Sequence, residues 1–101
     1  MLRYTPPMQL TLSGPLTEWR GPAPSCFVEV PPELTVPIRD AARLLSYGWG
    51  VVPVRVSLGE TTWTTSLFPR QGAYLVPIRA AVRRAEGLEE GAEVTLTLAL
   101  G

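Results

Sequence analysis

The feature that most constrains this chain is a strict alternation of side chains over residues 52–58, followed by a two-residue turn. Apolar residues occupy every second position of that segment, with polar residues or proline between them. A period of two is typical of a β-strand with one buried face. Gly59 and Glu60 come next, and a turn with glycine first suits a type II′ hairpin. The sequence therefore predicts a hairpin whose return strand covers residues 61–68.

The short turn also predicts the register of the hairpin. If Leu58 faces Thr61, then Val56 faces Trp63, and Trp63 points into the core with the valines. The other expected pairs are Val54 with Thr65, Val52 with Leu67, Arg55 with Thr64 and Ser57 with Thr62.

Similar patterns predict four more strands, at residues 8–13, 25–30, 73–76 and 93–100, and two helices, at 35–45 and 77–86. Residues 14–24 hold two glycines and three prolines and are expected to form a loop that contains Trp19. The fold class is therefore mostly β, a small closed or nearly closed barrel with two short helices, in the order β-β-α-β-β-β-α-β. The length of 101 residues indicates one domain, over 8–101, after a lead of residues 1–7.

The absence of two residue types excludes most catalytic chemistry. The chain has no histidine, and its nine basic residues are all arginine. It therefore lacks the imidazole of a nucleophile–base pair and the lysine of a Schiff base or phosphate loop. Arginine does not deprotonate in proteins and replaces neither. We expect no enzyme activity and no cofactor.

The remaining composition points to a cytoplasmic domain without a membrane anchor. Cys26 is the single cysteine, so it makes no internal disulfide, and we expect it to be a buried apolar side chain. No cationic residue lies close to it in sequence to activate it. We expect no signal peptide, because residues 1–12 contain no apolar core segment, and no apolar run reaches membrane-spanning length. The formal net charge of zero gives no general attraction to nucleic acid or to anionic membranes.

Two runs resemble a known family. WTTSLFP at 63–69 is followed by GAYLVPIR at 72–79 and AVRRAEGL at 81–88, with FVEVP upstream at 27–31. Together they resemble the bacterial domain of unknown function 1905, over about residues 8–100. The resemblance implies a double-split β-barrel and assigns no biochemical activity.

A more distant likeness links residues 72–77 and 87–91 to the swapped-hairpin DNA-binding domains of transition-state regulators and antitoxins, which share the barrel class. The sequence departs from that pattern twice. Ala73 stands where an arginine usually follows the glycine, and the spacing from Pro77 to Gly87 is two residues longer.

The arginines of the two expected helices are the first candidates for a binding site. Guanidinium groups at such positions bind phosphate or carboxylate. The alternative is a solvent-exposed helix face that pairs with Glu86, Glu89 and Glu90. The candidate arginines are Arg79, Arg83 and Arg84, with Arg39 and Arg43.

Hydroxyl and aromatic side chains supply further candidates. Thr64 and Ser66 lie on the outer side of the expected hairpin and could hydrogen-bond a ligand, although such rows are commonly plain β-sheet surface. Tyr47 and Trp49 stand between glycines and suit an exposed aromatic contact or a cap on the barrel end. Trp63 and Tyr74 could stack a base or a sugar, but core packing is the favoured role.

Two interpretations of function follow. One is a non-enzymatic module that binds an unidentified protein or small ligand, as a monomer or homodimer. The alternative is a dimeric DNA-binding regulator, which would need an arginine surface repeated across a twofold axis. Nucleic acid is not the favoured partner, and we expect no membrane or metal partner. The acidic residues near the second helix lack the spacing of a calcium loop.

Overall fold

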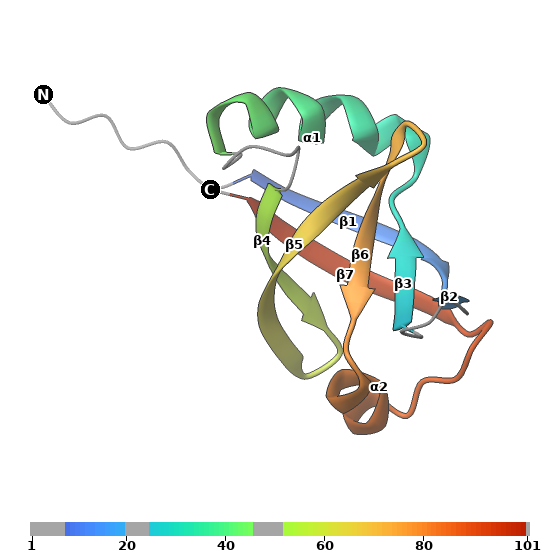
Figure 1. Ribbon diagram of the computed structural model, residues 1–101. Coiled ribbons are helices and arrows are strands. Elements are labelled where there is room, and N and C mark those ends of the chain that lie inside the picture. Colours follow the sequence, from blue (N-terminus) through green and yellow to red (C-terminus); the bar gives the residue numbers. More distant parts are fainter. Residues whose placement is uncertain (1–7, 20–24, 46–51, 101) are drawn as a thin grey trace, which may run out of the picture.

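The structure is a computed structural model, and it describes residues 8–19, 25–45 and 52–100. Over these residues the chain forms one seven-stranded antiparallel sheet that curls into a half-barrel (Figure 1). Two helices lie at opposite ends of the curled sheet. The expected mostly-β class is confirmed, but the order is β-β-β-α-β-β-β-α-β, with one strand more than the sequence predicts.

The strands follow one another in the sheet as β1-β7-β4-β5-β6-β3-β2. Their bounds are β1 Met8–Pro15, β2 Thr17–Trp19, β3 Ser25–Glu29, β4 Val52–Leu58, β5 Thr61–Arg70, β6 Ala73–Ile78 and β7 Glu93–Leu100, and the helices are α1 Pro32–Leu45 and α2 Ala80–Glu86. β1 and β2 occupy the two edges of the sheet, yet only Leu16 separates them along the chain. The edges must therefore approach each other, which is why the sheet curls.

The junction between the two edges is held by Leu16. Its side chain is buried, its N–H donates to the carbonyl of Ala92 at 2.9 Å, and its carbonyl accepts from Gly91 at 2.8 Å. Close by, a Cβ placed on Gly14 would lie 3.4 Å from Cγ1 of Val28 on β3. A side chain here would make an ordinary van der Waals contact with β3, so β1 passes beside β3 at this position.

The central hairpin has the expected register. Val56 lies opposite Trp63, and the other five pairs match as well. Trp63 is half-buried and packs against the core. Gly59 has a φ of 58°, and Gln71 is the single non-glycine with positive φ in the part of the chain that the structure describes. Glu60 therefore has negative φ, which suits the type II′ turn and excludes type I′.

The expected loop at 14–24 is wrong at five positions, because β1 extends through Gly14 and Pro15 and a further strand follows. Thr17–Trp19 form β2, which pairs with β3 and places Trp19 opposite Ser25. A three-residue segment is too short to show periodicity. Its strand conformation comes from the pairing with β3, which the local sequence does not encode.

Both helices begin at other residues than expected. α1 starts at Pro32, a favoured first helical residue, so Thr35 is not its N-cap. Thr35 is buried instead, and its Oγ1 donates to the carbonyl of Pro31 at 3.4 Å. α2 starts at Ala80, because β6 continues through Pro77.

Pro77 is tolerated inside β6 because of where the neighbouring ladder stops. The β5–β6 pairing covers Ala73–Leu75 and does not reach Pro77. On the side of β6 that faces β5, position 77 therefore has no ladder partner, and the absence of an N–H in proline costs no hydrogen bond there.

The core lies on the inner side of the curl. It is built from alternate residues of the strands together with Ile38 and Ala42 of α1 and Val82 of α2. Neither described helix is long and apolar enough to cross a membrane. The alternation that buries one set of side chains places the neighbouring set on the outer side of the sheet, where any binding surface must be sought.

Candidate functional site

The outer side of the sheet has two chemically different halves. On β1, β7, β4 and the first part of β5 it carries hydroxyl groups that bond to one another across the strands. The pairs are Thr11 with Thr97 at 3.4 Å, Ser13 with Thr95 at 2.7 Å, and Ser57 with Thr62 at 3.4 Å. Paired serine and threonine hydroxyls are ordinary strand surface.

The two hydroxyl candidates lie at the margin of this half. Thr64 is exposed and stands opposite Arg55, and Ser66 is half-buried opposite Pro53. The structure places both where the sequence expects them. Neither lines any of the three hollows described below.

The other half of the outer side, on β2, β3, β6 and the end of β5, is apolar. Four of its members point outward because the residues beside them in β3, β5 and β6 are buried in the core, and Trp19 joins them from β2. We call this surface the aromatic face, and it consists of Trp19, Phe27, Phe68, Leu75 and Pro77. Trp19 is 41% exposed and Phe68 is 49% exposed, although both are large apolar side chains.

The register brings these residues together from four strands. Phe68 lies opposite Leu75, and Phe27 lies opposite Pro77. Trp19 approaches from β2, the edge strand. The aromatic face is therefore a product of sheet topology, since its members are spread from position 19 to position 77.

Arg70 crosses the aromatic face. Its Cζ lies 4.0 Å from the centroid of the Trp19 ring, so the guanidinium stacks on the indole. A cation–π contact at an exposed site contributes about 0.5–1 kcal/mol. The stack links the end of β5 to β2 and forms a ridge between two hollows, which share Trp19, Phe27, Arg70 and Leu75.

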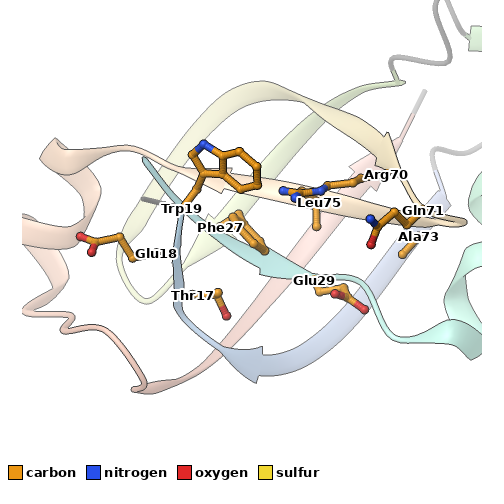
Figure 2. A pocket seen from close by; sticks show the side chains of 9 residues that line it. All are labelled: Thr17, Glu18, Trp19, Phe27, Glu29, Arg70, Gln71, Ala73 and Leu75. Atoms are coloured by element: carbon orange, nitrogen blue, oxygen red, sulfur yellow. The ribbon is translucent and has the colours of Figure 1, made fainter. Parts of the chain in front are cut away.

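The two hollows differ in character. The first has a volume of about 280 Å³ and is completed by polar side chains at its rim: Thr17, Glu29 and Gln71 (Figure 2). Glu18 also lines this hollow, although its side chain points away from the other labelled side chains. The second, of about 310 Å³, is completed by Ser25, Phe68 and Pro77 and is apolar. We call them the polar hollow and the apolar hollow.

Gln71 reaches the rim of the polar hollow through an uncommon backbone conformation. Its φ is 49° and that of Gly72 is 81°, so both central residues of the β5–β6 turn are left-handed, as in a type I′ turn. Few residues other than glycine, asparagine and aspartate adopt this region. The turn holds Gln71 beside Arg70 on the outer side.

The five candidate arginines do not form one surface. Arg39 and Arg43 are exposed on α1, whereas Arg79, Arg83 and Arg84 belong to α2 or its first flanking residue. The two helices lie at opposite ends of the half-barrel (Figure 1). The structure thus brings together Arg83 and Arg84, beside a shallow hollow of about 470 Å³ that also includes Leu88 and Glu89.

Arg83 is directed toward the core. One terminal nitrogen, Nη1, donates to Sγ of Cys26 at 3.0 Å, and Nε is buried without a hydrogen-bond partner. Cys26 is 3% exposed, as the sequence predicts. The two residues are 57 positions apart, so the cationic neighbour of the thiol is absent from the local sequence.

Glu86, one of the acidic residues near α2, contacts a strand of the central hairpin. Glu86 accepts a hydrogen bond of 2.5 Å from the hydroxyl of Thr61, at the start of β5. Within residues 8–19, 25–45 and 52–100, no three Cys, Asp or Glu side chains gather as metal ligands would.

The aromatic candidates divide between the core and the undescribed segments. Tyr74 is buried, in line with a core role. Tyr47 and Trp49 lie outside the described residues.

Sequence reasoning missed the aromatic face, although one signal was available. Phe27 stands between Cys26 and Val28 on a strand whose alternation sends those two inward. Phe68 likewise follows Leu67, which is fully buried. A large apolar residue at an outward position is the informative exception in such a pattern.

The comparisons with known proteins add one finding. The family model described as domain of unknown function (DUF1905) matches residues 13–98. No curated protein matches the chain. The double-split form of the barrel that the family resemblance implies stays a prediction. Since the match spans most of the sequence, the chain belongs to the family of domains of unknown function 1905.

Proposed function

We propose that this domain is a non-enzymatic binding module that holds a peptide segment of a partner protein on its aromatic face. The observation that carries the proposal is the exposure of Trp19 and Phe68 beside Phe27 on a sheet whose other outer half is covered by hydroxyls. Clustered exposed apolar side chains with polar residues at the rim mark interaction sites.

The residue types also support binding. Tryptophan, phenylalanine and arginine are enriched in protein interfaces, and tryptophan and arginine dominate their binding energy. Here Trp19 and Arg70 are stacked on each other at the centre of the surface, between the two hollows. Their mutual contact orders both side chains before a partner arrives, which lowers the entropy lost on binding.

The size of the surface favours a peptide over a second copy of the chain. Full side-chain areas of about 150–250 Å² per aromatic residue give the three rings roughly 250 Å² of exposed surface in total. A stable dimer needs about 800 Å² on each partner. We therefore expect a monomer that receives a short segment.

Two other function classes have less support. The whole chain lacks histidine and lysine, and the two carboxylates that line the polar hollow, Glu18 and Glu29, point in different directions (Figure 2). A pair of groups for acid–base work is not assembled there. DNA binding would call for a joint arginine surface, whereas the arginines of α1 and α2 lie at opposite ends.

A random peptide display selection against the wild-type domain tests the proposal. We expect enriched peptides whose binding falls at least tenfold in Trp19→Ala and in Phe68→Ser. Val36→Ala is the matched control, because Val36 is 58% exposed on α1, away from the aromatic face. Thermal unfolding of each variant establishes that it is folded.

The proposal is wrong if the selection enriches no peptide, or if the enriched peptides bind both aromatic-face variants as tightly as they bind the wild type.

A further inference from the structure

We propose that the segment bound by the aromatic face is a proline-containing peptide in the polyproline II conformation, with a basic side chain placed in the polar hollow against Glu29. This inference rests on the proposed function and names the chemistry of its partner. Three features of the site support it. They are the hydrogen-bond donors around the aromatic face, the Trp19–Arg70 ridge between the two hollows, and the carboxylate of Glu29.

Three side chains at the rim of the aromatic face carry hydrogen-bond donors. Trp19 offers an indole N–H, Arg70 a guanidinium and Gln71 an amide NH₂, whereas the hydroxyl of Thr17 already donates to the carbonyl of Pro15 at 3.4 Å. A polyproline II segment has no internal hydrogen bonds, and each proline contributes a carbonyl without an N–H. Such a ligand presents mainly acceptors, which match the donors of Trp19, Arg70 and Gln71.

The shape of the site agrees with a narrow, extended ligand. The Trp19–Arg70 ridge separates hollows of about 280 and 310 Å³. A polyproline II helix has three residues per turn and a rise of about 3.1 Å, so side chains that face the surface recur about every 9 Å and can straddle a ridge. Aromatic-lined grooves divided in this way are a recurring means of proline recognition.

Other peptide conformations fit less well. An α-helix has a diameter of about 10–12 Å with its side chains and would rest on the ridge without filling the hollows. Addition of a strand to the sheet would use β2, whose three residues offer a short edge compared with the usual five or six.

Charge orients the peptide. Glu29 lines the polar hollow next to Phe27 and Leu75, while the apolar hollow is completed by Phe68 and Pro77. A basic side chain gains an opposite charge only in the polar hollow. The prolines then occupy the apolar side of the ridge.

Fluorescence anisotropy with fluorescein-labelled peptides and the full chain tests the inference. The probes are Arg-Ala-Leu-Pro-Pro-Leu-Pro and the reverse-oriented Pro-Leu-Pro-Pro-Leu-Ala-Arg, because polyproline II ligands can bind in either direction. Matched peptides carry alanine in place of every proline, or glutamate in place of arginine. We expect at least one proline probe to bind at least tenfold more tightly than both of its matched peptides.

Variants locate the contact. Trp19→Ala should weaken binding of the proline probe at least tenfold, and Val36→Ala and Thr64→Ala should leave it unchanged. Glu29→Arg should reverse the preference, so that the glutamate peptide binds more tightly than the arginine peptide.

The outcomes separate the two proposals. If peptide display yields ligands that depend on Trp19 but the proline probes bind no better than their alanine versions, the polyproline inference is wrong and the binding module stands. If the glutamate peptide binds the wild type as well as the arginine peptide, the role of Glu29 is wrong. If neither display nor probes reveal ligands dependent on Trp19, both proposals fail.

Discussion

Arg83 shows how a charged side chain on a short helix can belong to the core. Its Nη1 donates to the Cys26 thiol at 3.0 Å, while Nε is buried and unpaired. The long aliphatic stem is free to pack against apolar neighbours. The side chain therefore combines favourable packing with an unsatisfied buried donor, and substitutions can separate these two effects.

We predict that Arg83→Met changes the free energy of unfolding by less than about 1 kcal/mol, because methionine retains the stem and removes the unpaired donor. Arg83→Ala should destabilise by about 1–3 kcal/mol, since it also loses the packing. Urea unfolding of both variants measures the difference, with Arg84→Met as an exposed control. Equal destabilisation by methionine and alanine would show that the hydrogen bond to sulfur matters more than the packing.

A second residue-scale prediction concerns Gly59. Its φ of 58° favours glycine, and a Cβ there would collide with the carboxylate of Glu86, which accepts the bond from Thr61. We predict that Gly59→Ala destabilises by about 2 kcal/mol, from backbone strain and from displacement of that carboxylate. Thermal or urea unfolding provides the measurement.

The control for Gly59 is Gly72→Ala. Gly72 has a φ of 81°, but a Cβ added there would have nothing within 4 Å, so alanine should cost only the backbone term of about 1 kcal/mol. In a Glu86→Ala background, the cost of Gly59→Ala should fall to the same value. An unchanged cost in that background would rule out the collision as its source.

At the scale of single residues, the sequence predicts the contacts that follow from the period of the strands. It does not predict contacts that are independent of that period. The pairing of Val56 with Trp63 follows from a period of two and a two-residue turn. The contact between Arg83 and Cys26 joins a helix to a strand 57 residues earlier, and neither local pattern contains it.

At the scale of elements, the turn between β5 and β6 joins stability to the proposed binding surface. Gln71 holds a left-handed conformation that asparagine and glycine adopt more readily, and it also lines the polar hollow. A residue that is unfavourable for the turn yet present at a candidate site suggests a role for its side chain.

We predict that Gln71→Asn raises the free energy of unfolding by about 0.5 kcal/mol, because Asn-Gly is the preferred type I′ pair. The same variant should weaken binding of the proline probe, because its shorter amide no longer reaches the ligand. Chemical denaturation and anisotropy measure the two effects. A variant that is neither more stable nor weaker in binding would contradict both assignments.

The elements most easily predicted are those with the longest alternating patterns. β4 and β7 have the expected bounds, and β1 extends only two residues beyond the expected strand. β2 and the end of β6 were not predicted, because a three-residue strand has no measurable period and Pro77 is normally a strand terminator. Since β2 carries Trp19, missing this strand also meant missing the centre of the candidate site.

At the scale of the whole molecule, the separation of α1 from α2 decides what the arginines can do together (Figure 1). We predict no strongly salt-dependent binding to a random DNA duplex, because each end of the half-barrel presents too few cations to release many counterions. Anisotropy of a labelled duplex at two salt concentrations measures this. Tight low-salt binding that weakens in Arg79→Ala/Arg84→Ala would instead favour the regulator interpretation.

The whole-molecule class follows from the sequence, whereas the position of the candidate site does not. Alternating strands and two short helices predict a small closed or nearly closed β-barrel, and the structure has a curled half-barrel of the same class. The aromatic face arises only when β2, β3, β6 and the end of β5 are placed side by side, and that order is a property of the complete topology.

The pairing of the first and last strands has a mechanical consequence. Met8 lies opposite Leu100, so the two ends of the described chain leave from the same end of one antiparallel ladder. A force that pulls these ends apart opens the β1–β7 ladder one pair at a time, like a zipper, and does not load all its hydrogen bonds together in shear. If the domain is held at both ends, it should therefore unfold at low force. Unfolding would begin at β1, the edge strand that is farthest along the sheet order from the aromatic face.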